Sequence, residues 1–244
     1  MKKYSVISIV LILLGYELFS FFVEKPLILP SLESIFIEIL IIMKSESFIE
    51  VILMTVSRTV ITFSLILVLV LVSGIFSAYS KIVEELLKPM VILLRTIPTV
   101  SLIIIVLIWF GRDLGPVIIV SLVIFPILYE IVLGSIKKVD NDLKDVCLLF
   151  GCTKFEKFWA LYYPNLIYNL SSGIQATLGL SFKVMVMAEV LAQSRVGIGQ
   201  ALNYEKTYLN ISGVFGWTFI LIIIVILFDF FIDIIMQILL NKLD

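Results

Sequence analysis

Long apolar stretches alternate with short polar segments along the whole sequence. A stretch of about 20 apolar residues is long enough to cross a bilayer as an α-helix. The pattern predicts about six such spans, at residues 5–23, 51–79, 89–110, 116–136, 165–191 and 211–236. We therefore expect an all-α, polytopic membrane helical bundle, with residues 1–244 forming a single transmembrane domain and a tight turn at residues 111–115.

Two segments near the N-terminus need separate interpretations. Residues 5–23 follow two lysines, as a signal peptide does, but no small-residue cleavage site comes after them, so we expect an uncleaved first span. Residues 30–47 include Ser31, which is suited to capping a helix, and carry an apolar stripe at Ile35, Ile39 and Ile42. This pattern predicts a short interfacial helix rather than a span.

Composition narrows the class of protein. The chain is 61% hydrophobic and only 15% charged, so its solvent must be lipid. The net charge of −1 argues against nucleic-acid binding. The sequence contains no histidine, which excludes histidine metal sites and Ser-His-Asp triads, and Cys147 and Cys152 do not form a CxxC motif. We expect no metal, no cofactor and no catalytic residue.

Lysine and arginine are distributed unevenly between the two sides of the predicted bundle. If the N-terminus is cytoplasmic, the inner segments hold ten of these cations and the outer segments hold five. Cytoplasmic loops carry the excess of positive charge in membrane proteins, so we expect both termini and residues 137–164 inside the cell. The Ile- and Lys-rich composition is typical of an AT-rich bacterium, which predicts a bacterial plasma (inner) membrane.

The segment at residues 137–164 is too polar to cross a bilayer and too apolar for a solvated loop. It includes the sequence DVCLLFGCTKFEKFWALYYP, residues 145–164. The spacing predicts a first helix with one apolar face, a turn at Gly151, and a second helix that begins with a capping box at Thr153 and Glu156. The apolar positions of the two helices are Leu143, Val146, Cys147, Phe150, Phe155, Phe158 and Tyr162. These faces either pack on the inner ends of the protein's own spans or bind a cytosolic partner.

The same spacing resembles the signature loop of binding-protein-dependent ABC transporter permeases. That motif begins Glu-Ala-Ala, has a glycine six residues after the Glu, and ends Ile-x-Leu-Pro. Asp145-Val146-Cys147, Gly151 and Leu161-Tyr162-Tyr163-Pro164 occupy these positions here without a gap. The segments RTIPTVSLIIIVLIWFG, MAEVLAQSRVGIG and LPSLESIF are similar to permeases of the nitrate, sulfonate, taurine and thiamine-precursor group.

The resemblance implies a function and a set of partners. In that family the loop is a coupling helix between spans four and five, and it sits in a groove of a separate ATP-binding subunit. The chain has no G-x-x-x-x-G-K-[ST] phosphate loop, so ATP hydrolysis is expected in that partner. An extracytoplasmic solute-binding protein and a second permease copy, forming a homodimer, are the other implied partners. The solute would be small and anionic or vitamin-precursor-like. The implied ATPase-coupling residues are Asp145, Val146, Cys147, Phe150, Gly151, Phe155, Phe158, Leu161 and Pro164.

Ionisable residues within the spans suggest where a solute passes. Arg58, Arg95, Glu130 and Glu189 lie near predicted span ends, where their side chains can reach the interface. Lys183 lies deep in the fifth span and ends a face of small and polar residues, which predicts either close helix packing or a pathway lining. We expect the pathway to include Ser172, Gln175, Gly179, Lys183 and Glu189. The alternative for Lys183 is a buried ion pair with Glu130 or another carboxylate.

A self-sufficient secondary transporter is the competing function. Six spans allow two inverted halves of three, and such repeats are typical of that class. The two halves of this sequence show no convincing self-similarity. A membrane enzyme is poorly supported, because histidine is absent and no nucleophile and base are clustered.

Overall fold

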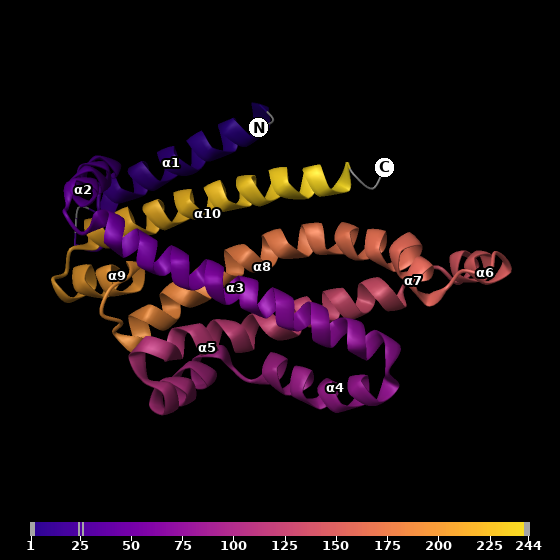
Figure 1. The fold of residues 1–244 in the computed structure, drawn as a ribbon. Coiled ribbons are helices and arrows are strands. Elements are labelled where there is room, and N and C mark those ends of the chain that lie inside the picture. The colour runs from indigo at the N-terminus through magenta and orange to yellow at the C-terminus, as the bar shows by residue number, and fades with distance from the viewer. Residues whose placement is uncertain (1–2, 24, 26, 242–244) are drawn as a thin grey trace.

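The chain folds into a bundle of long helices that run back and forth between two ends (Figure 1). The computed structural model describes residues 3–23, 25 and 27–241, and these contain helices and no strand. The all-α membrane bundle is therefore confirmed. Two of the cations used to predict the orientation, Lys2 and Lys242, lie outside the described residues.

Within the residues that the structure describes, four helices are long and apolar enough to cross a membrane: Phe48–Tyr79, Thr99–Lys137, Phe155–Ala192 and Ile211–Leu240. They contain the helices α3 (Phe48–Tyr79), α5 (Thr99–Lys137), α8 (Tyr163–Ala192) and α10 (Ile211–Leu240). The first predicted span corresponds to α1 (Lys3–Val23), whose apolar part, Val10–Val23, is shorter. The total of six spans stays a prediction.

The predicted third span is interrupted, which corrects the expectation of one continuous helix over residues 89–110. The helix α4 (Lys81–Thr96) ends before Ile97, and α5 starts at Thr99. Pro98 has no N–H to donate and forces Ile97 into an extended conformation, with φ −65° and ψ 128°. The expected turn before the fourth span is confirmed, because Gly111 breaks α5 with φ 67° and ψ −168°.

The interfacial segment forms a helix of its own, α2 (Leu32–Lys44). Ser31 caps it, and its hydroxyl accepts a hydrogen bond from the N–H of Ser34 (3.3 Å). Ile35 and Ile42 are buried, and the helix packs against α10. The short helix α9 (Ile198–Thr207) lies at the same end of the molecule as α2 (Figure 1).

The main core lies between α3, α5 and α8. Val70, Leu128 and Phe182, one from each helix, are completely buried within it. Glycines permit this close packing: a Cβ atom added to Gly74 of α3 would lie 2.6 Å from Val132 of α5. These three helices pack against one another along the bundle and join its two ends.

Candidate functional site

The polar segment between α5 and α8 projects from one end of the bundle (Figure 1). It consists of α6 (Asn141–Leu149), the single turn α7 (Lys154–Lys157) and a π-helical turn, η1 (Phe158–Tyr162), that continues directly into α8. The helix–turn–helix arrangement predicted here is therefore present. The second helix is shorter than expected, because a π-helical turn replaces its second half.

Local hydrogen bonds end the first helix. Gly151 has a φ of +68°, as predicted, a conformation that glycine adopts at little cost. The N–H of Cys152 donates to the carbonyl of Cys147 (2.9 Å), and the N–H of Gly151 donates to that of Leu148 (3.1 Å). This pair of bonds is the usual way in which a left-handed residue ends a helix.

The predicted capping box begins the second helix. The N–H of Thr153 donates to Oε2 of Glu156 (2.8 Å), and the N–H of Glu156 donates back to Oγ1 of Thr153 (3.3 Å). Both bonds satisfy backbone donors that a helix N-terminus leaves open. Cys147 in α6 and Cys152 between α6 and α7 are free cysteines, and the hydrogen bond to Cys147 raises the pKa of the Cys152 thiol.

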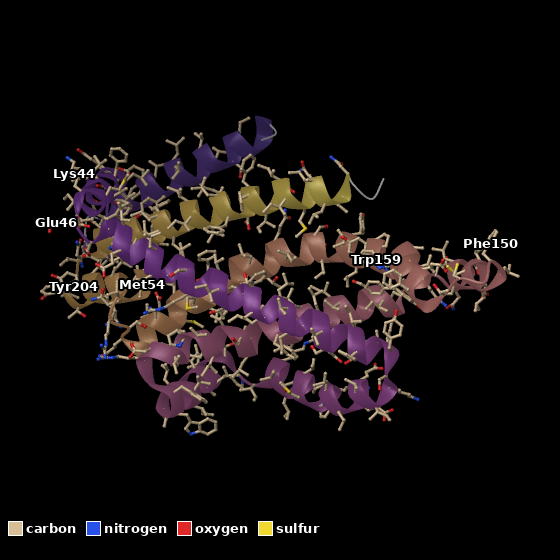
Figure 2. All side chains as sticks on the ribbon, in the orientation of Figure 1. Lys44, Glu46, Met54, Phe150, Trp159 and Tyr204 are labelled. Atoms are coloured by element: carbon tan, nitrogen blue, oxygen red, sulfur yellow. The ribbon has the colours of Figure 1, made fainter. Side chains whose placement is uncertain are left out.

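The predicted coupling residues divide into an exposed and a covered group. Phe150 is 83% exposed and Phe155 is 72% exposed, and Figure 2 shows Phe150 at the tip of the projecting segment. Asp145, Val146 and Gly151 are also exposed. The covered group comprises the buried Cys147 and the half-buried Phe158, Leu161 and Pro164. Packing against the protein's own surface explains the apolar character of this covered group but not that of the exposed residues.

A network of buried polar groups lies at the opposite end of the bundle. Glu189 of α8 is fully buried, and its Oε1 accepts a hydrogen bond from Nη1 of Arg58 in α3 (3.0 Å). Its Oε2 accepts from the hydroxyl of Thr55 (2.9 Å) and from the N–H of Gly199 (3.0 Å). Three separate segments, α3, α8 and the start of α9, are thus joined through one carboxylate.

The same side chains hold the loop before α9. The Arg58 Nη1 also donates to the carbonyl of Val196 (3.0 Å), and the hydroxyl of Thr55 accepts from the N–H of Ile198 (2.8 Å). This network corrects the prediction that Arg58 and Glu189 reach the interface at span ends. One signal of a buried Glu189 was available in the sequence, namely the two glycines that follow it at positions 197 and 199. In the structure, a Cβ atom at Gly197 or Gly199 would collide with the side chain of Glu189.

The residues predicted to line a pathway do not all share one face. Ser172 and Lys183 are exposed on α8. Gln175 instead donates to Oδ1 of Asp233 in α10 (3.1 Å), and a Cβ atom at Gly179 would contact Val225 of the same helix. Glu189 belongs to the buried network.

The proposed ion pair between Lys183 and Glu130 is wrong. Glu130 pairs with Arg95 of α4 instead. Lys183 forms no ion pair with any carboxylate in the described part of the chain.

Comparison with known proteins places these features in a family. The family model described as "Binding-protein-dependent transport system inner membrane component" matches residues 70–244. A putative ABC transporter permease of Methanocaldococcus jannaschii is 26% identical over 196 residues, which cover 78% of this chain and 73% of that protein. The formylaminopyrimidine transport permease ThiX of Halalkalibacterium halodurans is 25% identical, covering 87% and 84%. The taurine transport permease TauC of Escherichia coli is 24% identical, covering 64% and 57%.

Two solved structures share the fold. A chain of the inward-facing MetNI methionine ABC transporter superposes with a TM-score of 0.62 at 18% identity, covering 75% of this chain and 91% of that one. A chain of an amino acid ABC transporter determined with histidines gives a TM-score of 0.62 at 15% identity, covering 80% and 93%.

Proposed function

Because the chain belongs to the family of binding-protein-dependent transport system inner membrane components, we propose that it is the membrane-spanning permease subunit of an ABC importer. The projecting segment α6–η1, residues 141–162, is its docking element for a separate ATP-binding subunit. The exposure of Phe150 and Phe155 in this segment is the observation that carries the proposal. Each buried phenylalanine contributes roughly 1.5–3 kcal/mol to such a contact.

The connection between the segment and the bundle supports its role in coupling. The π-helical turn η1 continues into α8 without an intervening loop, and Pro164 lies in the first turn of α8. A displacement of the segment by the ATPase would therefore be passed directly to a helix of 30 residues. π-Helical turns inside helices are often found at functional sites.

The proposal includes two further partners and an orientation. A second copy of the chain would complete the pathway, and an extracytoplasmic binding protein would deliver the solute at the end that carries α9. Both termini and α6 would then be cytoplasmic, and ATP hydrolysis would take place in the partner chain. The substrates named for the relatives differ, since they include taurine and formylaminopyrimidine.

Substitution of the exposed phenylalanines tests the proposal. Phe150→Asp and Phe155→Asp each remove apolar area from the contact and introduce a charge that an apolar groove cannot solvate. We expect a normal level of the permease in the membrane, together with loss of ATPase co-purification and of ATP-driven uptake. Tyr208→Asp is the matched control, because Tyr208 is 67% exposed at the opposite end of the molecule and should leave ATPase binding unchanged.

The same measurements separate the competing functions. Normal ATPase binding per folded molecule in both phenylalanine variants would reject docking through this segment. A self-sufficient secondary transporter would show uptake in membranes that lack the ATPase, and its uptake would be insensitive to these substitutions.

A further inference from the structure

The two cysteines of the chain lie on either side of the turn in the projecting segment. Cys147 is in α6, and Cys152 comes directly after Gly151. In a continuous helix, residues five positions apart point about 140° away from each other around the axis, so their side chains do not meet. The spacing in the sequence therefore gives no sign that these two thiols can react with each other.

The turn at Gly151 brings the two cysteines together. The N–H of Cys152 donates to the carbonyl of Cys147, and the N–H of the left-handed Gly151 donates to that of Leu148. In a helix end of this type, the residue after the left-handed position folds back, and its side chain packs against the last turn of the helix. Cysteines occupy both of the positions that meet in this way.

The two thiols are close enough to be joined by a covalent bond. The side chain of Cys152 forms a hydrogen bond with that of Cys147. One carbonyl group and one N–H group, 2.9 Å apart, separate the two Cα atoms. This short connection keeps the Cα atoms within the roughly 4.4–6.8 Å that disulfides span, so rotation of the side chains is sufficient to bring the sulfurs to bonding distance.

The two thiols differ in how easily a reagent reaches them. Cys147 is 8% exposed, whereas Cys152 is half-buried in a segment that projects from the bundle (Figure 1). A small oxidant therefore reaches Cys152 first, with Cys147 beside it as the resolving thiol, an arrangement typical of redox-sensing cysteines. Because the hydrogen bond raises the pKa of Cys152, the resting pair is a dithiol and reacts more slowly than an activated thiolate.

We propose that Cys147 and Cys152 are a redox-modification site, at which a reversible disulfide locks the turn of the projecting segment. The oxidant is a small disulfide, RSSR. The thiolate of Cys152 attacks one of its sulfurs, which breaks the S–S bond, forms a mixed disulfide and releases RS⁻. The thiolate of Cys147 then attacks the sulfur of Cys152 and displaces a second RS⁻. The protons lost by the two cysteines convert both RS⁻ ions to RSH, so two cysteine thiols become one disulfide while RSSR is reduced.

The disulfide preserves the shape of the segment. It links two residues that a backbone hydrogen bond already joins, so the flanking Phe150 and Phe155 keep their relative positions. The cross-link instead limits the conformations that residues 147–152 can adopt when the turn opens. Intracellular disulfides are usually transient and redox-sensing, which fits the cytoplasmic orientation proposed for this segment. The inference goes beyond the proposed function, because the bond forms whether or not the segment binds an ATPase.

The test treats the purified full-length permease with oxidised glutathione and analyses the tryptic peptide 145–154, which contains both cysteines, by mass spectrometry. We expect the wild-type peptide to lose its two thiol hydrogens and to carry no glutathione, and we expect dithiothreitol to restore the thiols. Cys147→Ser is the matched control, because it lacks the resolving thiol and should retain glutathione on Cys152. Cys152→Ser should react more slowly, since its remaining thiol is the buried one.

Hydrogen exchange measures whether the disulfide locks the turn. Oxidation of the wild type should slow exchange of the amides in residues 147–152 at least about tenfold, as expected for cross-linking a short loop. The same treatment of Cys147→Ser should not slow it. The inference is overturned if the native wild type forms no internal disulfide, or if the disulfide leaves hydrogen exchange unchanged. Both measurements use the permease alone, so a failure of ATPase co-purification would refute the proposed function without affecting this result.

Discussion

The end that carries α9 and the end that carries α6 are stabilised by different kinds of contact. Near α9, the carboxylate of Glu189 bonds to Arg58 and Thr55, which are 131 and 134 positions away in the chain. In α6 and α7, the side-chain hydrogen bonds join residues two or three positions apart, such as Thr153 and Glu156. The first end depends on the assembled bundle, whereas the second is ordered by its own short-range bonds.

This difference between the two ends is consistent with different roles for them in the proposed permease. A segment held by local bonds can keep its shape while it moves relative to the bundle. An end locked by buried charges moves only together with the helices it joins. Because α8 runs from Tyr163 to Ala192, a length of about 45 Å, it connects the two ends directly.

The largest effect should come from removing the central carboxylate. Glu189→Ala leaves Arg58 without its ion-pair partner and leaves the N–H of Gly199 without an acceptor. Breaking a buried ion pair from one side costs about 3–5 kcal/mol. We expect a decrease of this size in the free energy of unfolding, measured by denaturant titration of the purified protein in detergent micelles.

Glu130→Ala provides the matched comparison. Glu130 also pairs with an arginine, but both side chains are about half exposed, so the expected loss is below about 1 kcal/mol. Equal losses in the two variants would show that burial does not distinguish the two ion pairs. The contrast between the two ends would then have no energetic basis.

A smaller effect should come from the backbone that closes over Glu189. A Cβ atom at Gly199 would lie 2.4 Å from Cβ of Glu189 and 2.6 Å from the carbonyl oxygen of Val186. Overpacking of this kind costs typically about 1–3 kcal/mol, and we expect Gly199→Ala to lower the free energy of unfolding by that amount. Gly134→Ala is the control in the same titration, because no neighbouring heavy atom lies within 4 Å of its added Cβ. A loss in Gly134→Ala as large as that in Gly199→Ala would exclude the collision as the cause.

The sequence predicted the segment ordered by local bonds better than the network. The turn at Gly151 and the capping box at Thr153 were both predictable, because each is fixed by residues within five positions. Long apolar stretches likewise predicted the spans that lie in α3, α5, α8 and α10, since their length follows from the thickness of the bilayer.

Features that depend on distant residues were missed. The partner of Glu189 is on another helix, and no local pattern indicates that Arg58 faces it rather than the interface. The pairing of Glu130 with Arg95 was hidden for the same reason, because α4 and α5 bring the two side chains together only in the folded bundle. The break at Pro98 was the exception. Its cause is local, but the continuous apolar composition on both sides obscured it.

The smallest effect should come from a substitution in the projecting segment, and the loss of stability should be limited to that segment. Gly151 has a φ of +68°, and an added Cβ would meet nothing within 4 Å, so a substitution is penalised through backbone conformation alone. Left-handed backbone costs roughly 1–2 kcal/mol for most residues, whereas asparagine adopts it readily. Gly151→Val should therefore loosen the α6–α7 turn, while Gly151→Asn should leave it intact.

Hydrogen exchange of residues 141–157 measures this local effect directly. We expect faster exchange in Gly151→Val than in Gly151→Asn, with no change in the main core at Val70 and Phe182, because the bonds that order the segment are its own. ATPase co-purification should decrease in the same order, since the exposed Phe150 and Phe155 flank the turn and lose their relative orientation. Slower exchange in the segment would contradict the local model, and so would faster exchange spreading into the core. The end that carries α6 would then have to be stabilised by the bundle, as the α9 end is.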